Sequence, residues 1–159
     1  IRIGVGIGDI STKISKKEGN LIDGRANSTA REAIDYLNDK KNKYQSVYMT
    51  TLLKVDDKEY IKIAQADVEK ADKYKTYEEF INTTLCACSA IEKKWNAIHA
   101  DTIKLKLAKN TQREMADKLG VQQSSVQRRL ISADYYTYEY YFETLRKIVK
   151  KLWEEVNNV

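Results

Sequence analysis

The chain has 159 residues, of which 42% are hydrophobic and 32% are charged. This composition is typical of a folded, soluble protein and excludes a disordered or fibrous chain. Lysine and arginine outnumber aspartate and glutamate by 28 to 23, which gives a net charge of +5 and a pI of about 9.0. Such a small excess is compatible with a polyanionic partner but does not require one.

Several classes of site and location are excluded by simple counts. The two cysteines, Cys86 and Cys88, have no further cysteine or histidine cluster nearby, which argues against a disulfide framework and against a zinc site. His99 is the sole histidine and has no serine or cysteine at a recognisable catalytic spacing. No apolar run approaches the ~20 residues that cross a bilayer. We therefore expect a cytoplasmic protein without metal, cofactor, catalytic residue or membrane contact.

The first residues predict a β-strand. In residues 1–10, isoleucine and valine at odd positions alternate with arginine and glycine at even positions, which is the period of a strand with one buried aliphatic face. The glycine face is expected to lie close to backbone or to a ligand. Because the chain begins with Ile1 inside an apolar run, we interpret it as a fragment that lacks an N-terminal part.

Helices and one more strand are predicted in the following segments. Asp23 or Asn27 is a candidate N-cap for a helix whose apolar stripe contains Ala30, Ala33, Ile34 and Leu37. β-branched and aromatic residues predict a second strand at 46–51. A further helix is indicated over 60–71.

From Thr76 the three- and four-residue spacing of apolar side chains predicts a long helix that continues to Ile98, with Thr76 and Glu79 as a capping box. A short helix over 101–108 follows, with Ile103 and Leu107 directed inward. The last long helix starts at about residue 135, and its apolar stripe extends to Val156. Its aromatic cluster is interpreted as packing rather than base stacking, and the helix is either a dimer interface or a partner of the 76–98 helix.

Residues 111–130, TQREMADKLGVQQSSVQRRL, have the pattern of a helix-turn-helix. Such a motif needs a small residue where the helices cross and a residue that tolerates positive φ at the turn, and Ala116 and Gly120 meet these needs. Thr111 and Glu114 form a capping box at the start of the first helix. The residues expected to seal the inner face are Met115, Leu119, Val121, Val126 and Leu130.

The outer face of the second helix then carries side chains that can recognise bases. Amide side chains can pair with adenine, and an arginine fork can pair with guanine. The candidate base-reading residues are Gln122, Gln123, Ser124, Gln127 and Arg128. The candidate phosphate contacts are Lys109, Thr111, Gln112, Lys118 and Arg129.

Two competing interpretations remain open. A helix-turn-helix can also mediate protein contacts, as in a signalling or scaffold protein. The segment GVGIG at 4–8 suggests a phosphate cradle, although it lacks the full dinucleotide spacing and no helix follows directly. If a nucleotide did bind there, Asp9, Asp23, Gly24 and Arg25 would be its contacts.

Four segments in order resemble the SatD family of bacterial proteins: IRIGVGIGDIST, DGRANSTAREAIDYL, KTYEEFINTTLCACSAIEKKW and TQREMADKLGVQQSSVQRRLISADYY. The last is also similar to the helix-turn-helix of sigma-factor region four and of many repressors. The resemblance implies that residues 1–75 are the later half of a nucleotide-cyclase-like fold. It also implies that the metal-binding carboxylates of such enzymes lie in the missing half.

These observations predict an α+β fold that is mainly helical, with a cyclase-like strand and helix remnant at 1–75 and a helical module at 76–159. The helix-turn-helix occupies about 111–131. The predicted function is non-enzymatic binding of double-stranded DNA with sequence preference, in a bacterial transcription regulator. A homodimer joined through the C-terminal helix is one of the two arrangements expected for that helix.

Overall fold

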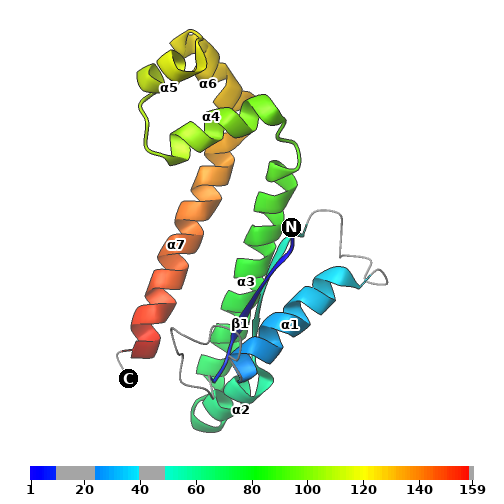
Figure 1. The fold of residues 1–159 in the computed structure, drawn as a ribbon. Coiled ribbons are helices and arrows are strands. Elements are labelled where there is room, and N and C mark those ends of the chain that lie inside the picture. Colours follow the sequence, from blue (N-terminus) through cyan, green and yellow to red (C-terminus); the bar gives the residue numbers. More distant parts are fainter. Residues whose placement is uncertain (10–23, 40–48, 158–159) are drawn as a thin grey trace, which may run out of the picture. The chain divides into compact units, whose positions relative to one another are not determined.

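The computed structural model describes residues 1–9, 24–39 and 49–157. Within these ranges it contains two strands and seven helices, so the predicted mainly helical α+β class is confirmed (Figure 1). The elements are β1 (Ile3–Ile7), α1 (Arg25–Asn38), β2 (Thr51–Val55), α2 (Asp57–Ala66), α3 (Val68–Glu92), α4 (Ala97–Leu107), α5 (Gln112–Leu119), α6 (Gln123–Ser132) and α7 (Tyr135–Asn157).

The chain forms two compact units, Ile1–Ser89 and Ala90–Val159. The division falls near the end of α3, whereas the sequence placed a boundary at 75/76, which lies inside this helix. Since α3 runs without interruption from Val68 to Glu92, it contributes residues to both units.

The first unit is built on a β–α–β arrangement. β1 and β2 are parallel and in register from the pair Ile3 and Thr51 to the pair Ile7 and Val55. α1, which connects them in the chain, packs against the sheet and lies alongside β1 in Figure 1. Ala33, Leu37 and Leu52 form the buried centre of this packing.

The face of β1 that packs against α1 carries the glycines and not the isoleucines. A Cβ on Gly6 would lie 2.0 Å from the carbonyl oxygen of Ala26, so the strand and α1 meet backbone to backbone. This confirms that the glycine face lies close to another backbone. The prediction that the aliphatic face is buried is wrong, because Ile3, Val5 and Ile7 are 51%, 40% and 47% exposed. A helix can approach this closely only on the face without side chains, which leaves the aliphatic side chains on the other face.

The edge of β2 that faces away from β1 is covered by polar side chains of α3. The carboxamide of Asn82 accepts a hydrogen bond from the N–H of Leu53 and donates one to its carbonyl oxygen, both at 2.8 Å. Ser89 bonds the hydroxyl of Thr50 at 2.7 Å and accepts from its N–H at 3.4 Å. These side chains act as a substitute for a neighbouring strand.

Glu78 lies on α3 one helical turn before Asn82, and its carboxylate bonds the backbone of Val55. Glu78, Asn82 and Ser89 therefore form a row of polar side chains along this edge of β2. Four residues of a helix advance about 6 Å, and two residues of a strand advance about 6.6 Å, so the row matches the strand repeat. The carboxylate of Glu78 also accepts a hydrogen bond from the hydroxyl of Tyr60. Burial raises the pKa of Glu78, while its hydrogen bonds to Tyr60 and Val55 partly oppose this rise.

Several predicted element boundaries in the first unit are corrected by the structure. The second strand lies at Thr51–Val55 rather than 46–51, of which 46–48 lie outside the described residues. Asn27 lies inside α1, whose N-cap is Gly24, and Asp23 lies outside the described residues. The capping box at Thr76 is wrong, because the Thr76 hydroxyl bonds the Asp72 carbonyl within α3. No glycine or proline interrupts residues 68–92, so the helix begins earlier than the apolar pattern indicated.

The predicted helix over 76–98 ends at Glu92, and a new helix begins at Ala97. Asn96 separates them, because its side chain caps α4 by accepting a hydrogen bond from the N–H of His99 at 2.9 Å. Ile103 is buried as predicted. Leu107 was predicted to face inward but is 59% exposed, since it is the last residue of α4.

Candidate nucleic-acid interface

α5 begins where the sequence predicted. The Thr111 hydroxyl accepts a hydrogen bond from the N–H of Glu114 at 3.3 Å, and the Glu114 carboxylate accepts one from the N–H of Thr111 at 2.7 Å. This is a complete capping box. The hydrogen bond from the Thr111 backbone lowers the pKa of Glu114, with a further contribution from the Thr111 hydroxyl. The start of the first helix is therefore fixed by its own first turn.

The turn between α5 and α6 depends on Gly120. This residue has φ 63° and ψ 35°, a left-handed conformation that is costly for a residue with a Cβ. After it, the N–H of Val121 donates to the carbonyl oxygen of Ala116 at 3.0 Å. Ala116 is itself buried, as the close crossing of the helices requires. Both structural roles predicted for Ala116 and Gly120 are confirmed.

Buried side chains fix how α6 is rotated about its axis. Met115, Val126 and Leu130 are each 0% exposed. Leu119 and Val121, the other two residues predicted for this inner face, are half-buried at its margin. Because Val126 and Leu130 lie one turn apart and both face inward, the opposite face of α6 is directed away from the core.

The predicted base-reading residues do not all have the same environment. Gln122, Gln123, Ser124 and Arg128 are exposed. Gln122 is the N-cap of α6 but makes no capping hydrogen bond with its side chain. Gln127 is half-buried and is held by other side chains. Four of the five residues thus form an accessible polar surface at the first turns of α6.

A chain of hydrogen bonds connects Gln127 to three elements. Its Oε1 accepts from the hydroxyl of Tyr136, at the start of α7, at 2.8 Å. The same oxygen accepts from Nε2 of Gln112, the first residue of α5, at 2.5 Å. Oε1 of Gln112 in turn lies 3.5 Å from Nε2 of Gln123. Gln112, predicted as a phosphate contact, therefore lies directly beside the base-reading candidates.

Tyr136 was not predicted to be part of this site. The aromatic cluster around it is predicted to serve packing, and its neighbours Tyr135 and Tyr138 are indeed buried. Tyr136 itself is 40% exposed. One signal in the sequence could have indicated this, because Tyr136 is out of phase with the apolar stripe formed by Tyr138, Tyr141 and Leu145.

The predicted phosphate-contacting residues lie on α5 and α6 or just before α5. Lys109 is exposed and has φ 64° just before α5. Lys118 is exposed and donates to the side-chain oxygen of Asn110 at 2.5 Å. Arg129 is half-buried. Residues 109–132 contain five lysine and arginine residues against two carboxylates, so the local charge is positive.

His99 has a partner that sequence spacing did not indicate. Its Nε2 lies 3.0 Å from the hydroxyl of Ser132, at the end of α6. Within the described part of the chain, its Nδ1 is buried and makes no hydrogen bond. A catalytic serine and histidine pair normally has a third group that orients the imidazole through this nitrogen. The contact joins α4 to α6.

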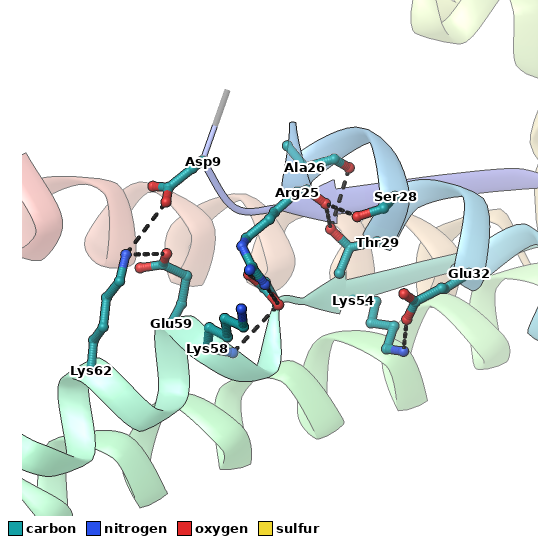
Figure 2. A network of polar contacts seen from close by, with 11 residues as sticks. Asp9, Arg25, Ala26, Ser28, Thr29, Glu32, Lys54, Lys58, Glu59 and Lys62 are labelled. Carbon is teal, nitrogen blue, oxygen red and sulfur yellow. Dashed lines mark hydrogen bonds and ion pairs between the residues drawn. The ribbon is translucent and has the colours of Figure 1, made fainter. Parts of the chain in front are cut away.

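Two of the four candidate nucleotide contacts, Arg25 and Asp9, are engaged in ion pairs (Figure 2), whereas Gly24 is the N-cap of α1 and Asp23 lies outside the described residues. Arg25 lies 3.1 Å from the carboxylate of Asp56. Lys62 lies 3.4 Å from Asp9 and 2.9 Å from Glu59, and these carboxylates raise its pKa. The glycines of GVGIG face α1 instead of an open cradle. Among the residues that the structure describes, no group of three histidine, cysteine or acidic residues could hold a metal ion.

Within residues 1–9, 24–39 and 49–157, none of the helices combines the length and the apolar character that a bilayer span requires. Comparison with known proteins identifies the family of the chain. No curated protein and no solved structure matches the chain. The model of the SatD family matches residues 1–151, nearly the whole sequence and all four segments noted above. The chain belongs to the SatD family.

Proposed function

We propose that this protein binds double-stranded DNA with sequence preference through α5 and α6, and that it regulates transcription in the bacterial cytoplasm. The observation that carries the proposal is the exposed row of Gln122, Gln123, Ser124 and Arg128 at the first turns of α6. In helix-turn-helix proteins the N-terminal residues of the second helix contact base edges in the major groove. The buried Val126 and Leu130 keep Ser124 and Arg128 directed outward, whereas Gln123 is accessible because it is the first residue of α6.

The chemistry of the row suits base recognition. A glutamine carboxamide can donate to and accept from adenine at the same time, and an arginine can bind the two acceptors of guanine. We assign Gln123 to the first role and Arg128 to the second, because both are exposed on α6. Gln122 and Ser124 lie beside Gln123 and are assigned to the adjacent base pairs.

Phosphate contacts are assigned to Lys109, Thr111, Gln112, Lys118 and Arg129. Lys109 and Lys118 are exposed cations at the two ends of α5, and Thr111 and Gln112 open its first turn. A helix N-terminus has unpaired N–H groups and a positive dipole end, both of which favour phosphate. These contacts would position α6 in the groove without carrying sequence information.

Binding selection from random duplexes at near-physiological salt tests the proposal. The selected duplex is then measured in competition with unrelated DNA, for the wild type and for two variants. Gln123→Ala is expected to relax the base preference, whereas Lys118→Ala weakens binding to all sequences and reduces the salt slope by about 1. Lys147→Ala, an exposed cation on α7, is the matched control and is expected to leave both unchanged. Unchanged preference in Gln123→Ala would contradict the assignment.

We propose in addition that α7 joins two copies of the chain. Phe142 and Val149 lie two turns apart on this helix and are 42% and 48% exposed, so an apolar stripe is accessible. A two-fold dimer would present two α6 helices to successive major grooves of one operator. Light scattering at increasing concentration tests this, with Val149→Glu expected to give the monomer mass. A monomeric wild type at high concentration contradicts it.

A further inference from the structure

We infer that Tyr136 is a positioning residue for base recognition, which it controls through Gln127 and Gln112. This inference rests on the proposed function and names a specificity-determining residue that does not itself touch the base edge. The hydroxyl of Tyr136 donates a hydrogen bond to Oε1 of Gln127 at 2.8 Å. A carboxamide whose oxygen accepts this bond has its NH2 group on the opposite side.

The same oxygen of Gln127 also accepts from Nε2 of Gln112. This second bond sets the direction of the Gln112 carboxamide, because its Nε2 faces Gln127 and its oxygen then faces Gln123. Oε1 of Gln112 lies 3.5 Å from Nε2 of Gln123, which is a long contact but has the donor and acceptor correctly matched. A continuous row of matched donors and acceptors thus runs from the hydroxyl at the start of α7 through the amides of Gln127, Gln112 and Gln123, and the hydroxyl holds the Gln127 end of this row in place.

The orientation matters because a carboxamide is a donor at one end and an acceptor at the other. With one N–H of Gln123 Nε2 directed towards Gln112, its Oε1 and its second N–H are left for the amino group and the N7 of adenine in the major groove. The NH2 group of Gln127 is left for an acceptor such as N7 of a purine. If the amides turned over, donors and acceptors would exchange places and the preferred base would change. Fixing the amides in advance also removes a part of the ordering cost of binding.

The environment of Tyr136 supports a role at the surface rather than in the core. Its side chain is 40% exposed, in contrast to Tyr135 and Tyr138, which are 3% and 9% exposed. The ring of Tyr136 contacts that of Tyr135 at a centroid distance of 5.9 Å, so the ring remains held when the hydroxyl is removed. Asp134, with φ 53°, forms the bend between α6 and α7 that brings Tyr136 back over Gln127.

The test is Tyr136→Phe, which removes only the hydroxyl. The ratio of affinities for the selected duplex and for an unrelated duplex is expected to fall about two- to tenfold, the range of one hydrogen bond. The salt slope stays as in the wild type and affinity for unrelated DNA changes little, because the cationic phosphate contacts Lys109, Lys118 and Arg129 lie outside the amide chain. Tyr140→Phe is the matched control, since Tyr140 is on the same helix, is 70% exposed and lies outside the amide chain.

A double-mutant cycle distinguishes positioning from a general structural effect. In a Gln127→Ala background, Tyr136→Phe is expected to cause no further loss of the specificity ratio, because the residue through which it acts is absent. If the wild type shows a sequence preference and Tyr136→Phe leaves that preference intact, the inference is overturned and the proposed function stands. An equal loss in both backgrounds also overturns it. A wild type without preference for any duplex overturns the proposed function, and this inference with it.

Discussion

The indole N–H of Trp95 donates a hydrogen bond to the carbonyl oxygen of Ala133, with 2.8 Å between the nitrogen and the oxygen. Ala133 is the C-cap of α6, so this bond ties the segment before α4 to the end of the proposed recognition helix. The Trp95 ring also packs edge-on against Tyr138, at a centroid distance of 4.9 Å. A residue outside the helix-turn-helix thus helps to hold it in place.

Replacing Trp95 with phenylalanine should separate the hydrogen bond from the ring contact. The aromatic contact with Tyr138 is retained in part, whereas the carbonyl oxygen of Ala133 loses its donor. We expect the free energy of unfolding to decrease by about 1–3 kcal/mol, the usual cost of an unpaired buried polar group together with some lost packing. Urea denaturation followed by circular dichroism measures it. A variant with an unchanged midpoint would show that the bond adds nothing to stability.

Substitutions at Gly120 should report only on backbone conformation. A Cβ built there has no neighbour within 4 Å, so there is no steric conflict with the rest of the protein. Gly120→Ala is expected to destabilise by about 1 kcal/mol because of the left-handed φ. Gly120→Asn should cost less, since asparagine tolerates this region better. Thermal unfolding compares the two, and an equal effect of both would argue against a conformational origin.

The capping box should make the stability of α5 depend on pH in the acid range. The folded-state pKa of Glu114 lies below its usual value of 4.5, so its stabilising effect is complete above the unfolded pKa. It is lost as the pH falls through the folded pKa. Wild type and Glu114→Gln are therefore expected to differ most above pH 4.5 and to converge below it. Urea midpoints measured from neutral pH down to acid test this, and a difference independent of pH would rule out the carboxylate as its source.

Gly6 in β1 and Gly8 just after it should tolerate alanine to different degrees. A Cβ on Gly6 would lie 2.0 Å from the carbonyl oxygen of Ala26, whereas a Cβ on Gly8 would have its nearest neighbour at 3.1 Å. We expect Gly6→Ala to destabilise the first unit by about 3 kcal/mol or more, because backbone must move, and Gly8→Ala by clearly less. The loss of pairing between β1 and β2 is measured by amide hydrogen exchange in β2. Equal protection in the two variants would mean that β1 and α1 are not held as described.

Local signals explain which features could be predicted from the sequence. The start of α5, the turn at Gly120 and the inner face at Met115, Val126 and Leu130 were all anticipated. Each depends on residues within a few positions of one another: a capping pair, a left-handed glycine and a helical spacing. The outward direction of Ser124 and Arg128 followed from these three features by geometry, whereas the half-buried position of Gln127 did not.

Features that depend on distant partners could not be predicted in the same way. The alternation in β1 indicates two faces but not which one packs, and the answer depended on the approach of α1. Asn82 and Leu53 are 29 positions apart, and nothing in either segment indicates their contact. The role of Tyr136 depends on the bend at Asp134, a positive φ at a residue that carries a Cβ.

The contact between Asn82 and Leu53 limits how the sheet of the first unit can be extended. The N–H and the carbonyl of Leu53 are both satisfied by one side chain, and the backbones of Val55 and Thr50 are engaged by Glu78 and Ser89, so an incoming peptide would have to displace these side chains along that border. An additional strand, whether contributed by the same polypeptide or by another, is therefore expected to be laid down more readily beside β1, next to the exposed isoleucines.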